Sequence, residues 1–257
     1  MEIGQGSPAD YPALAALTEA EGWNYSVKDF QDLDLSGCGK TLVAKQDGSP
    51  KGMVTIFDYG DVGWISNLLV YRPLRGKGLG SELLRECVRQ FGGKRTIALF
   101  SYQESKRFYL KEGMKQDRDF SYVKFVGGRK GSAREGALSE GMYNMDERAF
   151  GYRRKGLLRM LMGNGHIICP SKGPGFAILR PDPVEATVGP VVAEDGEAGL
   201  ELLYASFNIL GIGSHAVVPE GELEGVQELF RVSRLYYGEK PFTDFSLVKA
   251  FSGLEFG

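Results

Sequence analysis

The sequence predicts an α/β protein of two domains, each with a mixed sheet flanked by helices. Three observations lead to this prediction. The chain has 257 residues, 42% of them apolar, which is enough for two domains with cores of their own. Helical and strand periodicities alternate along it. A similar order of elements recurs on either side of residues 126–137, a segment rich in glycine, arginine and lysine that is typical of a connection.

The first half shows a clear change from helices to strands and back. Its predicted helices cover residues 8–21, 26–33, 80–91 and 104–114, and its predicted strands lie within 41–71, at 96–102 and at 120–126. In the third helix the apolar face is the best defined, with apolar residues recurring every three or four positions. That face comprises Gly80, Leu83, Leu84, Cys87, Val88 and Phe91.

The second half repeats the alternation without an obvious repeat of residues. We expect helices over 146–162, 196–207 and 222–233 and strands over 166–170, 175–181, 186–193, 215–219 and 245–251. Arg153 and Arg154 are expected on a solvated basic face of the first of these helices, and His166 in a structural role.

Composition excludes several classes of function. The formal charge of −2 favours neither nucleic acid nor an anionic membrane as a partner. Cys38, Cys87 and Cys169 are widely spaced and the chain has two histidines, so we expect neither a disulfide framework nor a metal centre. The N-terminal segment lacks the pattern of a signal peptide, and no apolar run reaches about 18 residues. We therefore expect a soluble cytoplasmic protein.

The segment YRPLRGKGLGSELL, residues 71–84, is the strongest candidate for a binding site. It lies where a strand gives way to a helix, and the first turn of a helix offers unpaired N–H groups and a positive dipole to an anion. Glycines let the backbone approach a phosphate, and Arg75 and Lys77 add positive charge. Arg75, Gly78 and Gly80 fit the pattern Arg-x-x-Gly-x-Gly.

Two other glycine motifs fit less well. SGCGKT, residues 36–41, resembles the end of a nucleotide-binding P-loop, but Asp34 stands where the first glycine is required and a strand pattern follows. A dinucleotide fingerprint starting at Gly76 would need glycine at Ser81. Both are therefore discounted in favour of the third reading.

The sequence LLVYRPLRGKGLGSELL resembles the acyl-CoA-binding motif of the GCN5-related N-acetyltransferases, the GNAT superfamily. The resemblance covers roughly residues 1–126 and includes GWN after the early helix and RFYLKEGM further on. From about Gly136 the chain is similar to the C-terminal domain of tandem members, on the weaker cues DERAFGYRR and VGPVVAED. The resemblance implies two GNAT-like domains with mostly antiparallel mixed sheets, 1–126 and 137–257, the second lacking the phosphate-binding motif.

The resemblance also implies site residues. Acetyl-CoA would be the co-substrate, with no metal; backbone groups of Leu68, Leu69 and Val70 would hold its pantetheine. Its pyrophosphate would be held by Arg75, Gly76, Lys77, Gly78, Leu79, Gly80 and Ser81. Tyr109 matches the tyrosine that protonates the departing sulfur, and Trp23 and Asn24 would wall the acceptor pocket.

Some family positions differ here, which leaves the general base open. Trp64 stands where some members have a glutamate, and Tyr102 where many have an asparagine. Asp58 and Asp61 are expected to be solvated hairpin residues, with a water chain toward them or Ser66 as one route for the proton.

The predicted function is transfer of an acetyl group from acetyl-CoA to an amine, by direct attack in a ternary complex. The acceptor would be a small-molecule or peptide amine, which the sequence does not identify. The alternative is a non-catalytic acyl-CoA-binding or sensor protein on the same fold. A nucleotide-dependent phosphotransferase using Ser36–Thr41 is discounted.

Overall fold

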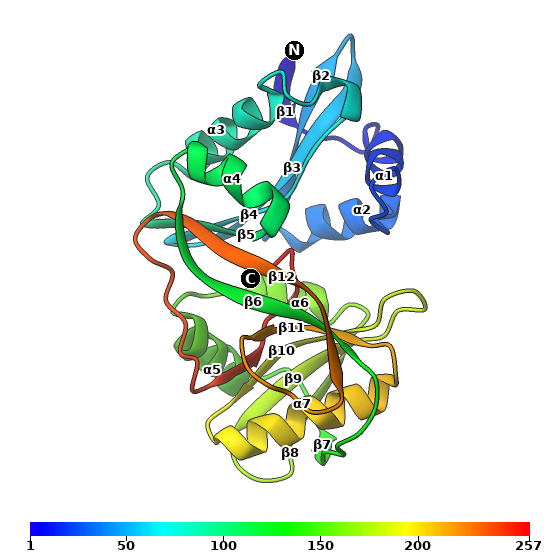
Figure 1. The fold of residues 1–257 in the computed structure, drawn as a ribbon, viewed down its shortest axis with the longest axis vertical. Helices are drawn as coiled ribbons and strands as arrows, with labels where there is room; N and C mark the ends of the chain where they lie inside the picture. Colours follow the sequence, from blue (N-terminus) through cyan, green and yellow to red (C-terminus); the bar gives the residue numbers. More distant parts are fainter. The chain divides into compact units, whose positions relative to one another are not determined.

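A computed structural model describes all 257 residues, which divide into two compact units. Unit 1 comprises Met1–Leu99 and unit 2 comprises Phe100–Gly257 (Figure 1). The division precedes residue 126, where the first domain was predicted to end. The physical reason is that β6 (Lys115–Phe125), expected in the first half, hydrogen-bonds along its length to strands from the second half.

Unit 1 is built on a sheet with the strand order β1-β2-β3-β4-β5. Neighbouring strands are antiparallel except β4 and β5, which are parallel. The first strand was not predicted; the others were. The strands are β1 (Glu2–Gln5), β2 (Gly39–Gln46), β3 (Ser49–Tyr59), β4 (Val62–Val70) and β5 (Thr96–Tyr102), of which the last crosses into unit 2.

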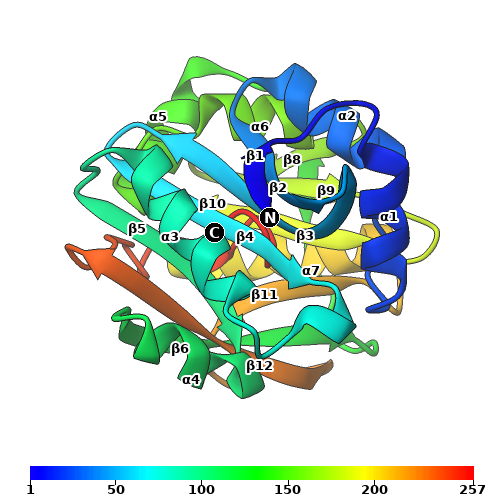
Figure 2. The ribbon, with the colours of Figure 1, turned by 90° about the horizontal axis from the view of Figure 1, so that it is seen from above.

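Helices cover both faces of this sheet (Figures 1 and 2). On one face α1 (Tyr11–Glu19) and α2 (Val27–Ser36) pack against it, and their contact is a cluster of Tyr11, Leu14, Phe30, Val43, Met53 and Leu69. On the other face lies α3 (Leu79–Phe91), which buries Leu79, Leu83, Leu84, Cys87 and Phe91. The burial of this apolar face fixes where α3 begins, at the end of β4.

Unit 2 has a sheet with the order β12-β6-β11-β10-β9-β8-β7, and β13 also pairs with β10. Only β10 and β11 are parallel. The α/β class with a mixed, mostly antiparallel sheet in each half is thus confirmed. The remaining strands are β7 (Ala133–Glu135), β8 (His166–Pro170), β9 (Gly175–Arg180), β10 (Thr187–Ala193), β11 (His215–Pro219), β12 (Val226–Gly238) and β13 (Val248–Ala250).

The longest helix of unit 2, α7 (Gly196–Leu210), runs along strands β8–β10 and closes the main core (Figure 1). The single helix expected over residues 146–162 is in fact two, α5 (Glu140–Phe150) and α6 (Lys155–Leu161), because the chain turns at Gly151. The fourth helix, α4 (Gln103–Lys111), follows β5 as predicted.

The helix predicted over residues 222–233 is wrong. Residues 222–225 precede a strand, and residues 226–233 form the first part of β12, which pairs with β6 from Val226 opposite Phe125 to Tyr236 opposite Lys115. Glu, Gln and Leu in this segment favour a helix locally, but β6 is a central strand whose backbone groups need partners on both sides. Tertiary pairing therefore overrides the local preference.

Arg154 is buried, which corrects the expectation that it lies on a solvated face. Its guanidinium binds Asp146 through two hydrogen bonds of 3.0 and 2.7 Å and donates to the carbonyl oxygen of Gly257. The side chains of Arg154 and Asp146 are 0% and 1% exposed. The neighbouring Arg153, with its side chain 74% exposed, pairs with Glu147 at the surface as expected.

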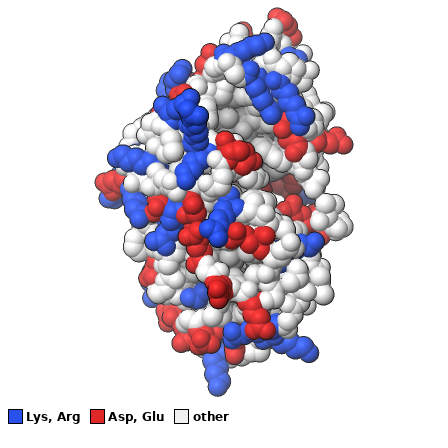
Figure 3. All heavy atoms as spheres, viewed as in Figure 1, with Lys and Arg blue, Asp and Glu red and all other residues white.

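The surface carries charges of both signs. On the face in Figure 3, acidic and basic side chains are interspersed, as the net charge of −2 suggests. Among the helices, none combines the length and apolar character needed to cross a bilayer.

We predict that Arg154→Met lowers the free energy of unfolding by about 3–5 kcal/mol, because it leaves the Asp146 carboxylate buried without its partner. The matched change Arg153→Met removes an exposed pair, and its cost is expected to stay below about 1 kcal/mol. Urea unfolding followed by circular dichroism measures both. Equal losses in the two variants would contradict a structural role specific to Arg154.

Candidate functional site

β4 separates from β5 part of the way along its length. The parallel pairing covers only Val62–Trp64 opposite Thr96–Ala98, whereas β4 continues to Val70. β5 leaves the rest of that edge unpaired, and an edge strand offers N–H and C=O groups to a further strand, although the carbonyl oxygen of Val70 also accepts from Arg75. Leu68, Leu69 and Val70, predicted to bind pantetheine, lie in this continuation.

A β-bulge interrupts the same part of β4. The register against β3 shifts between Thr55 opposite Ser66 and Met53 opposite Leu69, and Asn67 adopts a positive φ of 51°. A bulge turns the strand locally and re-aims its side chains and backbone. Asparagine is among the few residues that tolerate this conformation. The sequence analysis missed this position, for which an asparagine inside an apolar strand was the available signal.

The predicted phosphate loop lies between β4 and α3. A short 3-10 turn (η1, Arg72–Leu74) follows β4, and then Gly76 and Gly78 adopt positive φ values of 74° and 93°. Gly78 is the N-cap of α3, so Leu79, Gly80 and Ser81 form the first helical turn. The left-handed conformation at Gly78 is strained for any residue with a Cβ, which explains the glycine there. The structure therefore brings the predicted residues 75–81 together at a helix N-terminus.

Arg75 is held at the start of this loop. Its Nε donates to the carbonyl oxygen of Val70 at 2.9 Å, and its Nη2 lies 2.7 Å from Oε1 of Glu21. The side chain is 45% exposed. Lys77 is exposed as well. An accessible guanidinium and ammonium beside a helix N-terminus make a site for an anion such as a phosphate.

Glu21, which the sequence analysis missed, lies next to this loop. Its carboxylate accepts from Arg72 Nε at 2.8 Å as well as from Arg75. The hydrogen bond from Arg72, supported by Arg75 and opposed by burial, lowers the pKa of Glu21 below its usual value. No local motif signals this contact, because the partners are separated by about fifty positions.

The predicted acceptor residues lie in the connection between α1 and α2, residues 20–26. Trp23 is half-buried and packs on the apolar cluster between these helices and the sheet, whereas Asn24 is exposed. Tyr25 donates its hydroxyl proton to Oδ1 of Asn67 at 3.2 Å. The connection is thus tied to the bulge of β4.

Tyr109 lies on α4 in unit 2, whereas the predicted acyl-CoA ligands lie in unit 1. Its side chain is 8% exposed, and its ring meets Phe108 edge-on at 4.9 Å between centroids. Tyr102, at the end of β5, contacts Phe230 at 5.3 Å, and burial raises its pKa to about 12. The catalytic role of Tyr109 stays a prediction.

The carboxylates considered as bases lie at the hairpin between β3 and β4, Asp58 near the end of β3 and Asp61 in the turn. Asp58 is exposed, accepts from the backbone N–H of Gly60 at 2.9 Å and pairs with Lys94 at 2.7 Å. Asp61 is exposed too. Ser36–Thr41 passes from the end of α2 into β2, so it lacks the helix that a P-loop requires.

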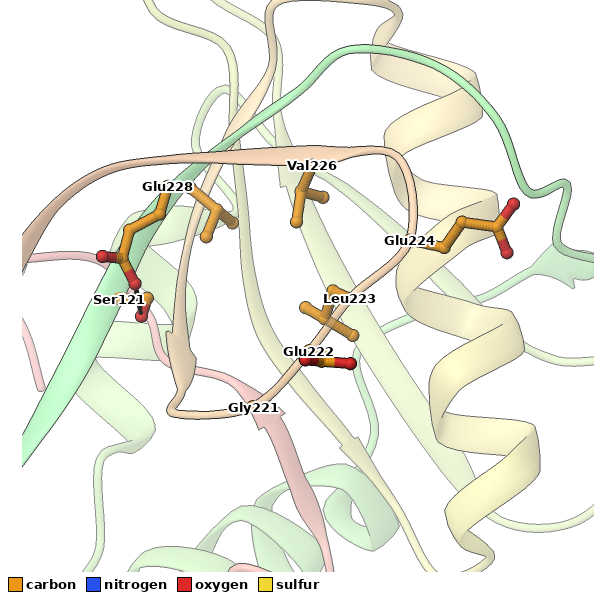
Figure 4. Close-up of a pocket in the computed structure, with 8 residues that line it drawn as sticks. Ser121, Gly221, Glu222, Leu223, Glu224, Val226 and Glu228 are labelled. Atoms are coloured by element: carbon orange, nitrogen blue, oxygen red, sulfur yellow. Dashed lines mark hydrogen bonds between the residues drawn. The ribbon is translucent and has the colours of Figure 1, made fainter.

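A cavity of about 580 Å³ lies in unit 2, and none of the predicted site residues lines it. Its wall combines Ser121 and Val123 of β6 with Gly221, Glu222, Leu223, Glu224, Val226 and Glu228 (Figure 4). The carboxylate of Glu228 binds side chains of unit 2: it accepts from Ser121 Oγ at 2.6 Å and from Arg231 Nε at 3.0 Å. The side chain of Glu224 points away from Ser121 and Glu228 (Figure 4).

The corresponding strand-to-helix junction of unit 2 is built differently. β10 pairs with β11 only at Thr187 and Val188, but β13 then pairs with β10 at Val191 and Val192. The next helix, α7, is capped by Asp195, whose side chain accepts from the backbone N–H of Ala198 at 2.8 Å. A carboxylate at the helix N-terminus already uses the dipole and repels a phosphate.

Comparison with known proteins identifies the class. Residues 11–114 match the model of the acetyltransferase (GNAT) family, and residues 142–243 match that of a second acetyltransferase (GNAT) domain. The chain therefore belongs to the GNAT acetyltransferases and has the tandem arrangement of two such domains. Acyl transfer is the general activity that this membership supports.

Relatives cover nearly the whole chain at low identity. The holothin acyltransferase of Pseudoalteromonas sp. (strain SANK 73390) is 23% identical over 93% of this chain and 88% of its own length. A putative acetyltransferase from Pyrococcus horikoshii has the same fold, with a TM-score of 0.84 at 18% identity, over 100% of this chain and 95% of that one. A GNAT from Sphaerobacter thermophilus gives 0.62 at 17% identity, over 95% and 98%.

We predict one binding site for acetyl-CoA per chain, because β13 and Asp195 occupy the junction of unit 2. Isothermal titration calorimetry measures the number of sites. The same titration of Asp195→Ala shows whether the carboxylate alone prevents phosphate binding at the start of α7. Two equivalent sites in the unaltered protein would contradict this interpretation.

Proposed function

We propose that this chain is an N-acetyltransferase that takes its acetyl group from acetyl-CoA. The observation that supports the proposal is the end of β4: a strand edge released from β5 continues into a glycine-rich turn that opens α3. The extended pantetheine chain of acetyl-CoA, with its amides, matches the free strand edge, and the pyrophosphate at the end of that chain matches the glycine-rich turn. The match to the GNAT family supports the same reading.

In this proposal the donor lies along unit 1. Backbone groups of Leu68, Leu69 and Val70 bind the pantetheine amides, and a backbone N–H nearby polarises the thioester carbonyl. Arg75 and Lys77 contact the pyrophosphate together with the N–H groups of the loop and of the first turn of α3, from Gly76 to Ser81.

The chemistry is a direct transfer between two bound substrates. The neutral amine nitrogen attacks the carbonyl carbon, the C–S bond breaks, and its electron pair goes to sulfur. The sulfur gains a proton, for which Tyr109 is the proposed donor, and the nitrogen loses one. The thioester is already activated, so the reaction needs no metal. Since Asp58 and Asp61 are exposed hairpin residues, we assign no protein base.

The proposed acceptor is a small-molecule or peptide amine that meets Trp23 and Asn24. An acyl-CoA-binding or sensor protein without catalysis is the alternative, since it would use the same donor site. Both proposals require Arg75, Gly78 and Gly80. They differ in whether a free thiol is released when an amine is supplied.

We predict that acetyl-CoA raises the melting temperature and ATP does not, because a ligand that binds only the folded state stabilises it.

Arg75→Gln should weaken acetyl-CoA binding about tenfold or more, the effect of losing a charge-assisted hydrogen bond. Arg89→Gln is the matched control, since Arg89 pairs with Glu86 on the exposed face of α3. No stabilisation by any acyl-CoA would remove the basis of the proposal.

We predict that Tyr109→Phe lowers turnover more than it weakens acetyl-CoA binding, because the proton is needed when the C–S bond breaks. A panel of amines with acetyl-CoA, followed by release of free thiol, first identifies a working acceptor. Tyr236→Phe on β12 controls for the loss of a hydroxyl elsewhere. Unchanged turnover would exclude Tyr109 from the mechanism, and binding without thiol release across the panel would favour the sensor.

A further inference from the structure

The connection between α1 and α2, residues 20–26, is tied to β4 and its continuation at two separate points. At one end, Glu21 binds two arginines of the phosphate loop. At the other end, Tyr25 hydrogen-bonds to Asn67 in the bulge of β4. Both partners border the proposed donor site: the arginines at its pyrophosphate end, and the bulge beside Leu68 and Leu69. Trp23 and Asn24 lie between the two attachments.

The attachment at Glu21 is made of several hydrogen bonds. Oε1 of Glu21 lies 2.8 Å from Arg72 Nε and 2.7 Å from Arg75 Nη2. Arg72 Nη2 also donates to the carbonyl oxygen of Ala20 at 3.0 Å, so Arg72 binds both a side chain and the backbone of the connection. The carboxylate is only 17% exposed. It is a shielded anion beside a loop suited to another anion.

A phosphate bound at this loop must share Arg75 with Glu21. The guanidinium has a fixed set of five N–H donors, of which one is already directed to Val70 and one to Glu21. A phosphate draws on the same charge and repels the carboxylate. Binding at the loop therefore changes the free energy with which the connection is held in place.

We propose that Glu21 is a positioning residue that couples the donor site to the acceptor connection. Through Arg75 and Arg72 it makes the position of Trp23 and Asn24 depend on whether an acyl-CoA pyrophosphate is bound. This inference rests on the proposed function, since it requires coenzyme A at the loop. A bound donor thereby sets the wall against which the acceptor amine is placed.

Trp23 provides the readout, because it is one of only two tryptophans and the other, Trp64, is fully buried. The experiment titrates the whole protein with coenzyme A and records tryptophan emission, while calorimetry gives the dissociation constant independently. The variant Trp23→Phe identifies the part of the signal that comes from Trp64. Melting temperatures without ligand check that each variant is folded.

We predict that coenzyme A changes the emission of Trp23 and that Glu21→Gln reduces this change to roughly half or less. The affinity for coenzyme A should stay unchanged or tighten by up to about fivefold, because a carboxylate that competes with phosphate for the partly exposed Arg75 is removed. Arg72→Gln should reproduce the loss of signal, and the double variant should add little, because both residues act through one contact. Glu19→Gln, an exposed charge two positions away, is the matched control.

The outcomes separate this inference from the proposed function. Absence of coenzyme A binding in calorimetry would overturn both. Binding without a Trp23 response, or a full response in Glu21→Gln, would overturn the coupling and leave the donor site intact. A purely structural role for Glu21 predicts a lower melting temperature with an unchanged ligand-induced response, which would also overturn the coupling.

Discussion

The early end of the pairing between β4 and β5 is the constraint on which the site in unit 1 depends. The two strands share three residue pairs, and β4 then continues alone on that side through the bulge at Asn67. The chain passes from this free edge through η1 and the glycine-rich loop into α3, whose apolar face is buried on the sheet. A helix so fixed can present its N-terminus only at the end of β4. Edge and helix start thus form one continuous surface.

Unit 2 has a similar arrangement of strands and helix, but its junction differs from that of unit 1. It has the same parallel pair of strands with a helix after the first of them, but β13 hydrogen-bonds to β10 beyond the short pairing. An aspartate caps its helix where unit 1 has Gly78. Where unit 1 has a free strand edge and a glycine turn, unit 2 has hydrogen bonds between β13 and β10 and the carboxylate of Asp195. We therefore expect the proposed donor binding to depend on the residues at the junction, since one fold can serve several roles.

Sequence patterns predicted the parts of the structure that local chemistry decides. The apolar spacing of α3 and the glycines at 76 and 78 act within one helix or turn, and the structure places them as expected. The strand β12 was missed because its partner, β6, is far away in sequence and supplies the decisive hydrogen bonds. Glu21 was missed for the same reason, because its partner Arg72 is about fifty positions away. Arg154 was missed because a single helix was expected over residues 146–162, whereas the chain turns at Gly151 between Asp146 and Arg154.

The ion pairs of Glu21 present an apparent conflict, because a carboxylate beside a phosphate loop opposes the binding of phosphate. The conflict is resolved if the same contact orders the connection that carries Trp23 and Asn24. Coupling between two sites is reciprocal, so any factor by which a bound donor favours one position of the connection must return as tighter donor binding when an acceptor holds that position. The repulsion between Glu21 and the phosphate then weakens donor binding mainly when no acceptor is bound. A bound acceptor offsets part of this repulsion.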